Sequence, residues 1–123
     1  MDERIAIFER LKPRLARYSP PLTARTDTGG RYELWSEKEL VIEGRKRKDV
    51  FFASLIIQSD YVGFYFMPVY ANTELASVFS PRLLALLKGK SCFHIKRLDD
   101  ELFGAIDEAL GLGWDLYRER GWV

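Results

Sequence analysis

The sequence predicts one α+β domain, a largely antiparallel sheet of about five to six strands flanked by an N-terminal and a C-terminal helix. After a first helix, strand-like segments run together and helix-like segments follow, which is typical of this fold class. The stretch from Val50 to Tyr70 reads as two apolar strands joined by a tight turn at Ser59-Asp60. No repeat, low-complexity tract or linker divides residues 1–123, so we expect a single domain.

The first element is a helix over residues 2–18. Its apolar residues recur at spacings of three and four, which places them on one stripe: Ile5, Phe8, Leu11, Leu15 and Tyr18. Pro13 lacks the amide hydrogen of a helix interior, so we expect the helix to bend or restart there. Pro20-Pro21 ends it.

Two strands are expected next, over residues 22–27 and 31–36, paired as a hairpin around Thr28-Gly29-Gly30. Residues 39–43 read as a further short strand or an extended edge. Residues 44–49 are charged almost throughout and read as a loop that leads into the central strands.

The two central strands, residues 50–57 and 61–67, are apolar at odd and even positions alike. A strand with one face in water carries polar residues at every second position. We therefore expect the middle of the sheet to be covered on both faces, by helices, by a partner subunit or by a ligand cavity.

The remaining elements have local start and stop signals. Pro68 closes the second central strand, and Asn72 caps a short helical turn. Ser80-Pro81 begins a helix that ends at Gly89. A short strand over residues 91–96 precedes the last helix, which an Asp caps and whose apolar stripe is Leu102, Ile106, Ala109, Leu110, Gly113 and Tyr117.

Composition excludes several classes of protein. The 19 basic and 18 acidic residues give a net charge of +1, which provides no general attraction to nucleic acid. Arg45-Lys46-Arg47-Lys48 reads as a solvated loop. One cysteine suits a reducing cytoplasm, and no apolar run approaches the ~20 residues that cross a bilayer. We expect a soluble cytoplasmic protein that binds neither nucleic acid nor membrane.

Cys92 and His94 stand two apart on a predicted strand, so both side chains face the same side. A thiol beside an imidazole suits a nucleophile with its base, or half of a metal site. The chain has no second cysteine or histidine, and a free cysteine is more often a small buried apolar group. We predict no catalytic residue and no metal ligand, and an enzyme that uses Cys92 and His94 stays an alternative.

A second alternative is a metal site on the acidic face of the last helix. Its carboxylates can bind hard cations or ferrous iron, although an amphipathic helix needs a polar face in any case. The residues concerned are Asp100, Glu101, Asp107, Glu108 and Asp115.

Three segments resemble the YdhG-like family of small uncharacterised domains: Phe51-Phe52-Ala53, the run from Val62 to Pro68, and the run from Gly89 to Lys96 before a closing helix. The resemblance extends over residues 5–118 and implies an α+β fold with an antiparallel sheet flanked by helices. The family has no established catalytic residues. Some members are labelled iron chaperones akin to frataxin, which implies iron handling, but this chain lacks an acidic balance.

The sequence thus favours a binding protein whose aromatic sheet face accepts a small molecule or a protein partner, with a homodimer among the partners that stay open. Tyrosine hydroxyls on a sheet without a polar face need partners, which supports a pocket or an interface. We expect no cofactor. The residues predicted to form the ligand site are Tyr32, Trp35, Phe52, Phe64, Phe66 and His94.

Overall fold

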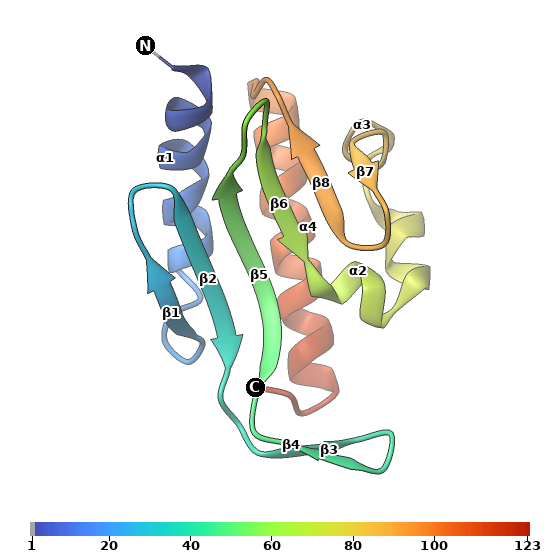
Figure 1. The fold of residues 1–123 in the computed structure, drawn as a ribbon. Coiled ribbons are helices and arrows are strands. Elements are labelled where there is room, and N and C mark those ends of the chain that lie inside the picture. Colours follow the sequence, from blue (N-terminus) through green and yellow to red (C-terminus); the bar gives the residue numbers. More distant parts are fainter. Residues whose placement is uncertain (1) are drawn as a thin grey trace.

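The structure is a computed structural model and describes residues 2–123. It confirms the predicted single-domain α+β fold with a six-stranded antiparallel sheet (Figure 1). The first elements are α1 (Glu3–Ala16), β1 (Thr23–Asp27), β2 (Arg31–Ser36), β3 (Leu40–Ile42), β4 (Arg45–Arg47) and β5 (Val50–Ile57). Those that follow are β6 (Val62–Phe66), α2 (Met67–Ala71), the 3-10 helix η1 (Thr73–Val78), α3 (Pro81–Leu84), β7 (Leu87–Lys88), β8 (Cys92–Ile95) and α4 (Asp100–Glu119).

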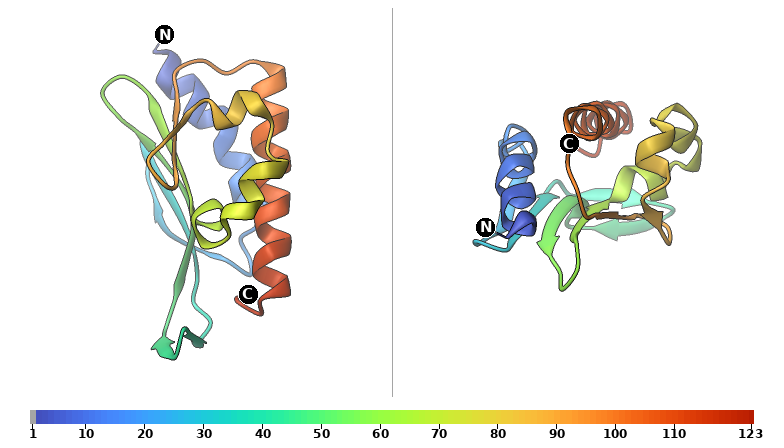
Figure 2. Two further views of the ribbon diagram at one scale, coloured as in Figure 1. Left: turned by 90° about the vertical axis from the view of Figure 1, so that its right-hand side faces the viewer. Right: turned by 90° about the horizontal axis from the view of Figure 1, so that it is seen from above.

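The sheet has the strand order β1-β2-β5-β6-β8-β7, so β5 and β6 occupy its middle as the sequence predicts. Every pair of neighbouring strands is antiparallel. Along β1 the register shifts between Ala24 and Thr26, and β7 at the other edge has only two residues. The helices lie together on one face of the sheet, and the opposite face carries none (Figure 2).

Asp2 caps the start of helix α1, and its side chain accepts a hydrogen bond from the Arg4 amide at 2.9 Å. The helix continues through Pro13 to Ala16 without restarting. Its buried stripe consists of Ile7, Phe8, Leu11 and Leu15. The prediction was wrong at Ile5, which is 43% exposed, because α1 turns Ile7 toward the sheet instead.

Helix α4 begins as predicted, with Asp99 accepting a hydrogen bond from the Leu102 amide at 2.9 Å. Every residue of its predicted apolar stripe is buried. Arg14 joins α1 to α4 through two hydrogen bonds to Asp107, of 2.9 and 2.6 Å. These side-chain hydrogen bonds hold the pKa of Asp107 below its ordinary value.

A bulge in β5 changes which of its residues face the helices. Leu34 pairs with Ala53 and Trp35 pairs with Phe51, so Phe52 is an extra residue in the ladder. Phe52 and Ala53 are both fully buried as a result. The regular alternation of faces along a strand is therefore broken before Ser54.

The charged loop predicted over residues 44–49 contains a strand. β3 and β4 pair as a two-stranded sheet that extends beyond the lower end of the main sheet (Figure 1). Glu43 and Gly44 turn between them, both with positive φ, as a two-residue hairpin turn requires. The helix expected between Ser80 and Gly89 is shorter than predicted, because β7 forms before Gly89.

The central hairpin was expected to be covered on both faces. The helices cover one face, where the core includes Phe52, Leu55, Phe64 and Phe66. In the described part of the chain no helix covers the other face, and residues of its strands line an open cavity there. No helix within residues 2–123 has the length and apolar character needed to span a membrane.

Candidate functional site

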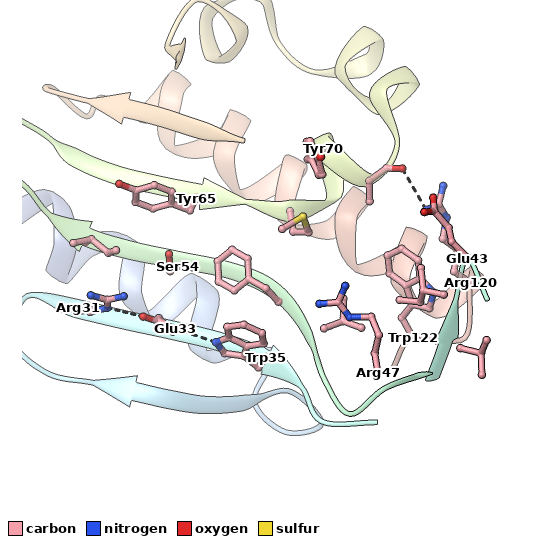
Figure 3. A pocket seen from close by; sticks show the side chains of 17 residues that line it. Arg31, Glu33, Trp35, Glu43, Arg47, Ser54, Tyr65, Tyr70, Arg120 and Trp122 are labelled. Atoms are coloured by element: carbon pink, nitrogen blue, oxygen red, sulfur yellow. Dashed lines mark hydrogen bonds and ion pairs between the residues drawn. The ribbon is translucent and has the colours of Figure 1, made fainter. Parts of the chain in front are cut away.

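The candidate site is a cavity of about 980 Å³ on the face of the sheet opposite the helices, here called the open face. Its floor comes from β2, β5 and β6, and its lower end from the β3–β4 hairpin, α2 and the C-terminal residues (Figure 3). The floor residues are Arg31, Glu33, Trp35, Phe51, Ser54, Ile56, Tyr65 and Met67. A face turned to water is normally polar in an antiparallel sheet, whereas this floor is largely apolar and aromatic.

Trp35 is held in place from several sides. Its indole N–H donates to Glu33 Oε1 at 3.1 Å, and its ring packs against Phe51 with the centroids 5.2 Å apart. The Arg25 guanidinium lies 4.5 Å from the centre of the indole and is itself held by Asp49, at 2.6 Å. The aromatic floor at this point is therefore preorganised.

Glu33 links Trp35 to Arg31. Arg31 Nε donates to Glu33 Oε2 at 2.5 Å, while Oε1 accepts from Trp35. Burial acts to raise the pKa of Glu33, but the hydrogen bonds from Trp35 and Arg31 outweigh burial and place that pKa below its ordinary value. Glu33 therefore stays ionised at neutral pH. Its two carboxylate oxygens already accept hydrogen bonds from Arg31 and Trp35 within the floor.

Tyr65 forms the centre of the floor. Its ring lies over Gly63, where an added Cβ would come within 2.7 Å of Tyr65 Cε2. The Tyr65 hydroxyl accepts a hydrogen bond from Gln58 Nε2 at 3.1 Å. Burial raises the pKa of Tyr65, so the hydroxyl stays neutral at neutral pH.

Two arginines, Arg47 and Arg120, line the lower end of the cavity (Figure 3). Arg120 lies 5.0 Å from the centre of the Trp122 ring and makes a long hydrogen bond of 3.4 Å to the Ala71 carbonyl. The Arg47 side chain forms no ion pair or hydrogen bond with any other residue in the range 2–123. Burial raises the pKa of Tyr117, and the charges of Arg120 and Arg47 oppose that rise.

Glu43 is the acidic residue at this end (Figure 3). With Glu33 already bonded to Arg31 and Trp35, the lower end offers two arginines against one carboxylate. The local charge is positive.

The structure separates the six residues predicted from the sequence as the ligand site. Trp35 lines the cavity. Tyr32, Phe52, Phe64 and Phe66 are buried in the core between sheet and helices, none more than 3% exposed, and do not line it. The bulge at Phe52 and the position of all helices on one face account for this, because both place these rings on the covered side.

His94 lies on the open face, but away from this cavity. Its ring stacks on Tyr61, with the centroids 3.8 Å apart and the planes at 10°. It lines a second, smaller cavity near β7.

Cys92 and His94 are on the same face, as expected, but no hydrogen bond between them occurs among residues 2–123. Burial raises the pKa of the Cys92 thiol, whereas a nucleophilic thiol needs a lowered one. The pair therefore lacks the geometry and the electrostatics that nucleophilic catalysis requires.

The acidic face of α4 is engaged in ion pairs. Asp107 bonds Arg14, Asp100 bonds Arg10 at 2.9 Å, and Glu101 lies 3.7 Å from Arg82. Across residues 2–123, no three His, Cys, Asp or Glu side chains are grouped so that they could hold a metal ion.

Several cavity residues were missed at the sequence level. Regular alternation would place Phe51 and Ile56 on opposite faces of one strand, and the bulge brings them to the same face. Arg47 was assigned to a solvated loop. Trp122 packs on Tyr117 with the centroids 5.0 Å apart, and no periodic pattern extends to the last residues of the chain.

Comparisons of the chain with family models, with curated proteins and with solved structures find no match.

Proposed function

We propose that this protein binds a small molecule with an apolar body and an anionic group in the cavity on the open face. The observation that carries the proposal is an uncovered sheet face with an aromatic floor, whose lower end is lined by both Arg47 and Arg120. The cytoplasmic location and the resemblance to YdhG-like domains remain predictions from the sequence.

The floor supplies the apolar part of the binding. Removing apolar surface from water contributes roughly 25 cal/mol per Å². Trp35, Phe51 and Tyr65 present flat ring surfaces, which suit an aromatic or extended aliphatic body. The volume of about 980 Å³ lies at the large end of the usual range for small-molecule sites.

The lower end supplies the specificity for charge. A guanidinium group donates two parallel hydrogen bonds to a carboxylate or phosphate. Arg47 has no carboxylate partner within residues 2–123, so its donors are free for a ligand. The carboxylate of Glu43 partly offsets the positive charge of the arginines. We therefore expect that removal of the Glu43 charge strengthens the binding of anions.

The site is organised before any ligand arrives. Trp35 is fixed by Glu33, Phe51 and Arg25, and Tyr65 is fixed by Gln58. A ligand therefore does not have to order these side chains, which lowers the free-energy cost of binding.

A protein partner, including a second copy of this chain, is the alternative occupant. Val41 and Tyr70 at the edge of the cavity are 67% and 50% exposed, and such apolar residues occur at interfaces. Sedimentation of the purified protein at micromolar concentration separates the two possibilities. A dimer that the probe below does not dissociate would favour the partner.

The proposal is tested with 1-anilinonaphthalene-8-sulfonate, a fluorescent probe with an aromatic body and one anionic group. A C12 alkyl carboxylate and the matching alcohol then compete for the site. We expect the carboxylate to compete at least about tenfold better, as expected for hydrogen bonds to a charged group.

Variants of the lining residues show which side chains produce the preference for the carboxylate over the alcohol. Arg47→Gln and Arg120→Gln should each abolish the preference for the carboxylate, and Glu43→Gln should increase it. Arg45→Gln is the matched control, because Arg45 is exposed on the same hairpin and does not line the cavity. Equal competition by acid and alcohol, or the same loss in all three arginine variants, would overturn the proposal.

A further inference from the structure

A second cavity, of about 410 Å³, lies at the β7 edge of the sheet and shares no residue with the first. We call it the edge notch. α3, the segment before β7, the residues that follow β8 and the first turn of α4 form its walls. Four cationic side chains line it, and none of its lining residues is acidic: Arg82, Lys88, Lys96 and Arg97.

The positive charge of the edge notch is largely uncompensated. Arg82 pairs with Asp99 at 2.5 Å and lies 3.7 Å from Glu101. Lys88, Lys96 and Arg97 have no carboxylate within 4.0 Å in the part of the chain that the structure describes. Three positive charges are thus concentrated in one notch of a chain whose net charge is only +1.

The short β7 strand creates the notch. The His94 amide donates to the Leu86 carbonyl at 3.0 Å, and β7 pairs with β8 only through Leu87 and Lys88. Beyond this pairing the chain continues from β8 to Lys96 without a neighbouring strand of the described residues on that side. The cationic side chains of β7 and of the residues after β8 line the notch that remains. Arg82 reaches the same place from α3.

The other walls suit a compact ligand. Leu86 and Leu102 give the notch an apolar side. His94 adds an imidazole whose ring is fixed by stacking on Tyr61. Cations beside an apolar wall are the features of sites for small organic anions.

We propose that the edge notch binds a compact phosphorylated small molecule, with its phosphate among Lys88, Lys96 and Arg97. The proposal does not depend on the function of the open-face cavity. An extended polyanion fits less well, because Asp100 and Glu101 stand at the start of α4 with side chains 98% and 73% exposed. These carboxylates repel a phosphate backbone that continues past the notch.

The test uses inorganic pyrophosphate and glucose 6-phosphate as probes, with glucose as the neutral counterpart. His94 is the one histidine in the sequence, so the NMR signals of its imidazole report on the notch without ambiguity. We expect saturable shifts of these signals with both phosphorylated probes and none with glucose.

Charge-removing variants complete the test. Lys96→Gln combined with Arg97→Gln should weaken pyrophosphate binding by about tenfold or more, since each lost contact is a hydrogen bond to a charged group. Lys46→Gln combined with Lys48→Gln removes the same charge from exposed residues on the other side of the molecule and should leave binding unchanged.

Three results would overturn the proposal. One is the absence of any saturable shift at millimolar probe. Another is an equal loss of affinity in both double variants, which would indicate a general effect of charge. The third is tighter binding of a single-stranded oligonucleotide than of pyrophosphate, which would assign the notch to nucleic acid.

Discussion

The ring of Tyr65 lies across Gly63 on the open face of the sheet, in space that any larger residue at position 63 would occupy. A Cβ there would come within 2.7 Å of Tyr65 Cε2 and 3.2 Å of Cζ. The two residues stand two apart on β6 and therefore share a face, so the absence of a side chain at Gly63 allows the ring of Tyr65 to lie over it. The shape of the cavity floor depends on this pair.

Gly63→Ala is therefore expected to displace the Tyr65 ring and to weaken binding of the anilinonaphthalene probe several-fold. The free energy of unfolding should change by no more than about 1 kcal/mol, because the end of the tyrosine side chain can move. Fluorescence titration and urea unfolding measure the two effects. Unchanged affinity in the variant would show that the ring does not shape the site.

Gly113→Ala tests the packing of α4 on the sheet. An added Cβ would lie 2.7 Å from Pro68 Cγ and 3.0 Å from its Cβ, and it would also meet the Phe66 ring. We expect the free energy of unfolding to fall by about 1–3 kcal/mol through overpacking. Gly104→Ala on the same helix is the control, because nothing lies within 4 Å of its added Cβ. It should stabilise the protein by roughly 0.5–1 kcal/mol, and a loss in both variants would contradict the packing argument.

The pair of Arg14 and Asp107 predicts a dependence of stability on pH. Hydrogen bonds from Arg14 lower the pKa of Asp107 in the folded chain below its ordinary value of 3.8. The resulting stabilisation is present at every pH above that value and is lost as the pH falls through the lower, folded pKa. Asp107→Asn removes it.

The difference in unfolding free energy between wild type and Asp107→Asn should therefore be constant near neutral pH and should shrink as the pH falls below 3.8, the ordinary value for this carboxyl. Urea unfolding across this range measures it. Asp115→Asn, an exposed position on the same helix, is the control. A difference that does not depend on pH would refute the assignment to the charge of Asp107.

Replacement of residues 38–48 by a short Gly-Ser turn tests the role of the β3–β4 hairpin. Ser36 and Val50 are paired across β2 and β5, so a short turn can connect the strands without them. We expect the main sheet to remain folded, with stability reduced by the loss of the partly buried Leu40 and Ile42. Circular dichroism reports on the fold. Binding of the probe should be lost with Arg47, and retained affinity would remove the hairpin from the site.

Much of the fold could be predicted from the sequence, because its signals are local. Asp99 caps α4, Ser80-Pro81 begins α3, and residues 28–30 turn between β1 and β2. Each depends on a few adjacent residues. β4 was missed because its side chains are exposed, so its pairing depends on backbone hydrogen bonds that leave no apolar pattern.

The site could not be predicted to the same degree. Since both faces of β5 and β6 are apolar, alternation does not show which face the helices cover. Phe52 was placed one position out of phase with its neighbours by a bulge, which no local sequence signal marks. The cations of the edge notch come from separate segments, so only the folded chain brings Arg82 near Lys96.

The two outer strands of the sheet bear on how the molecule behaves in a crowded solution. Along β1 the register shifts, and the charged Arg25 and Asp27 point outward; β7 stops after two residues, the second a lysine. Shifted, charged or very short edges resist pairing with the edge of another molecule. The protein is thus protected against fibre-like extension of its sheet, even though it keeps a broad apolar face open to solvent.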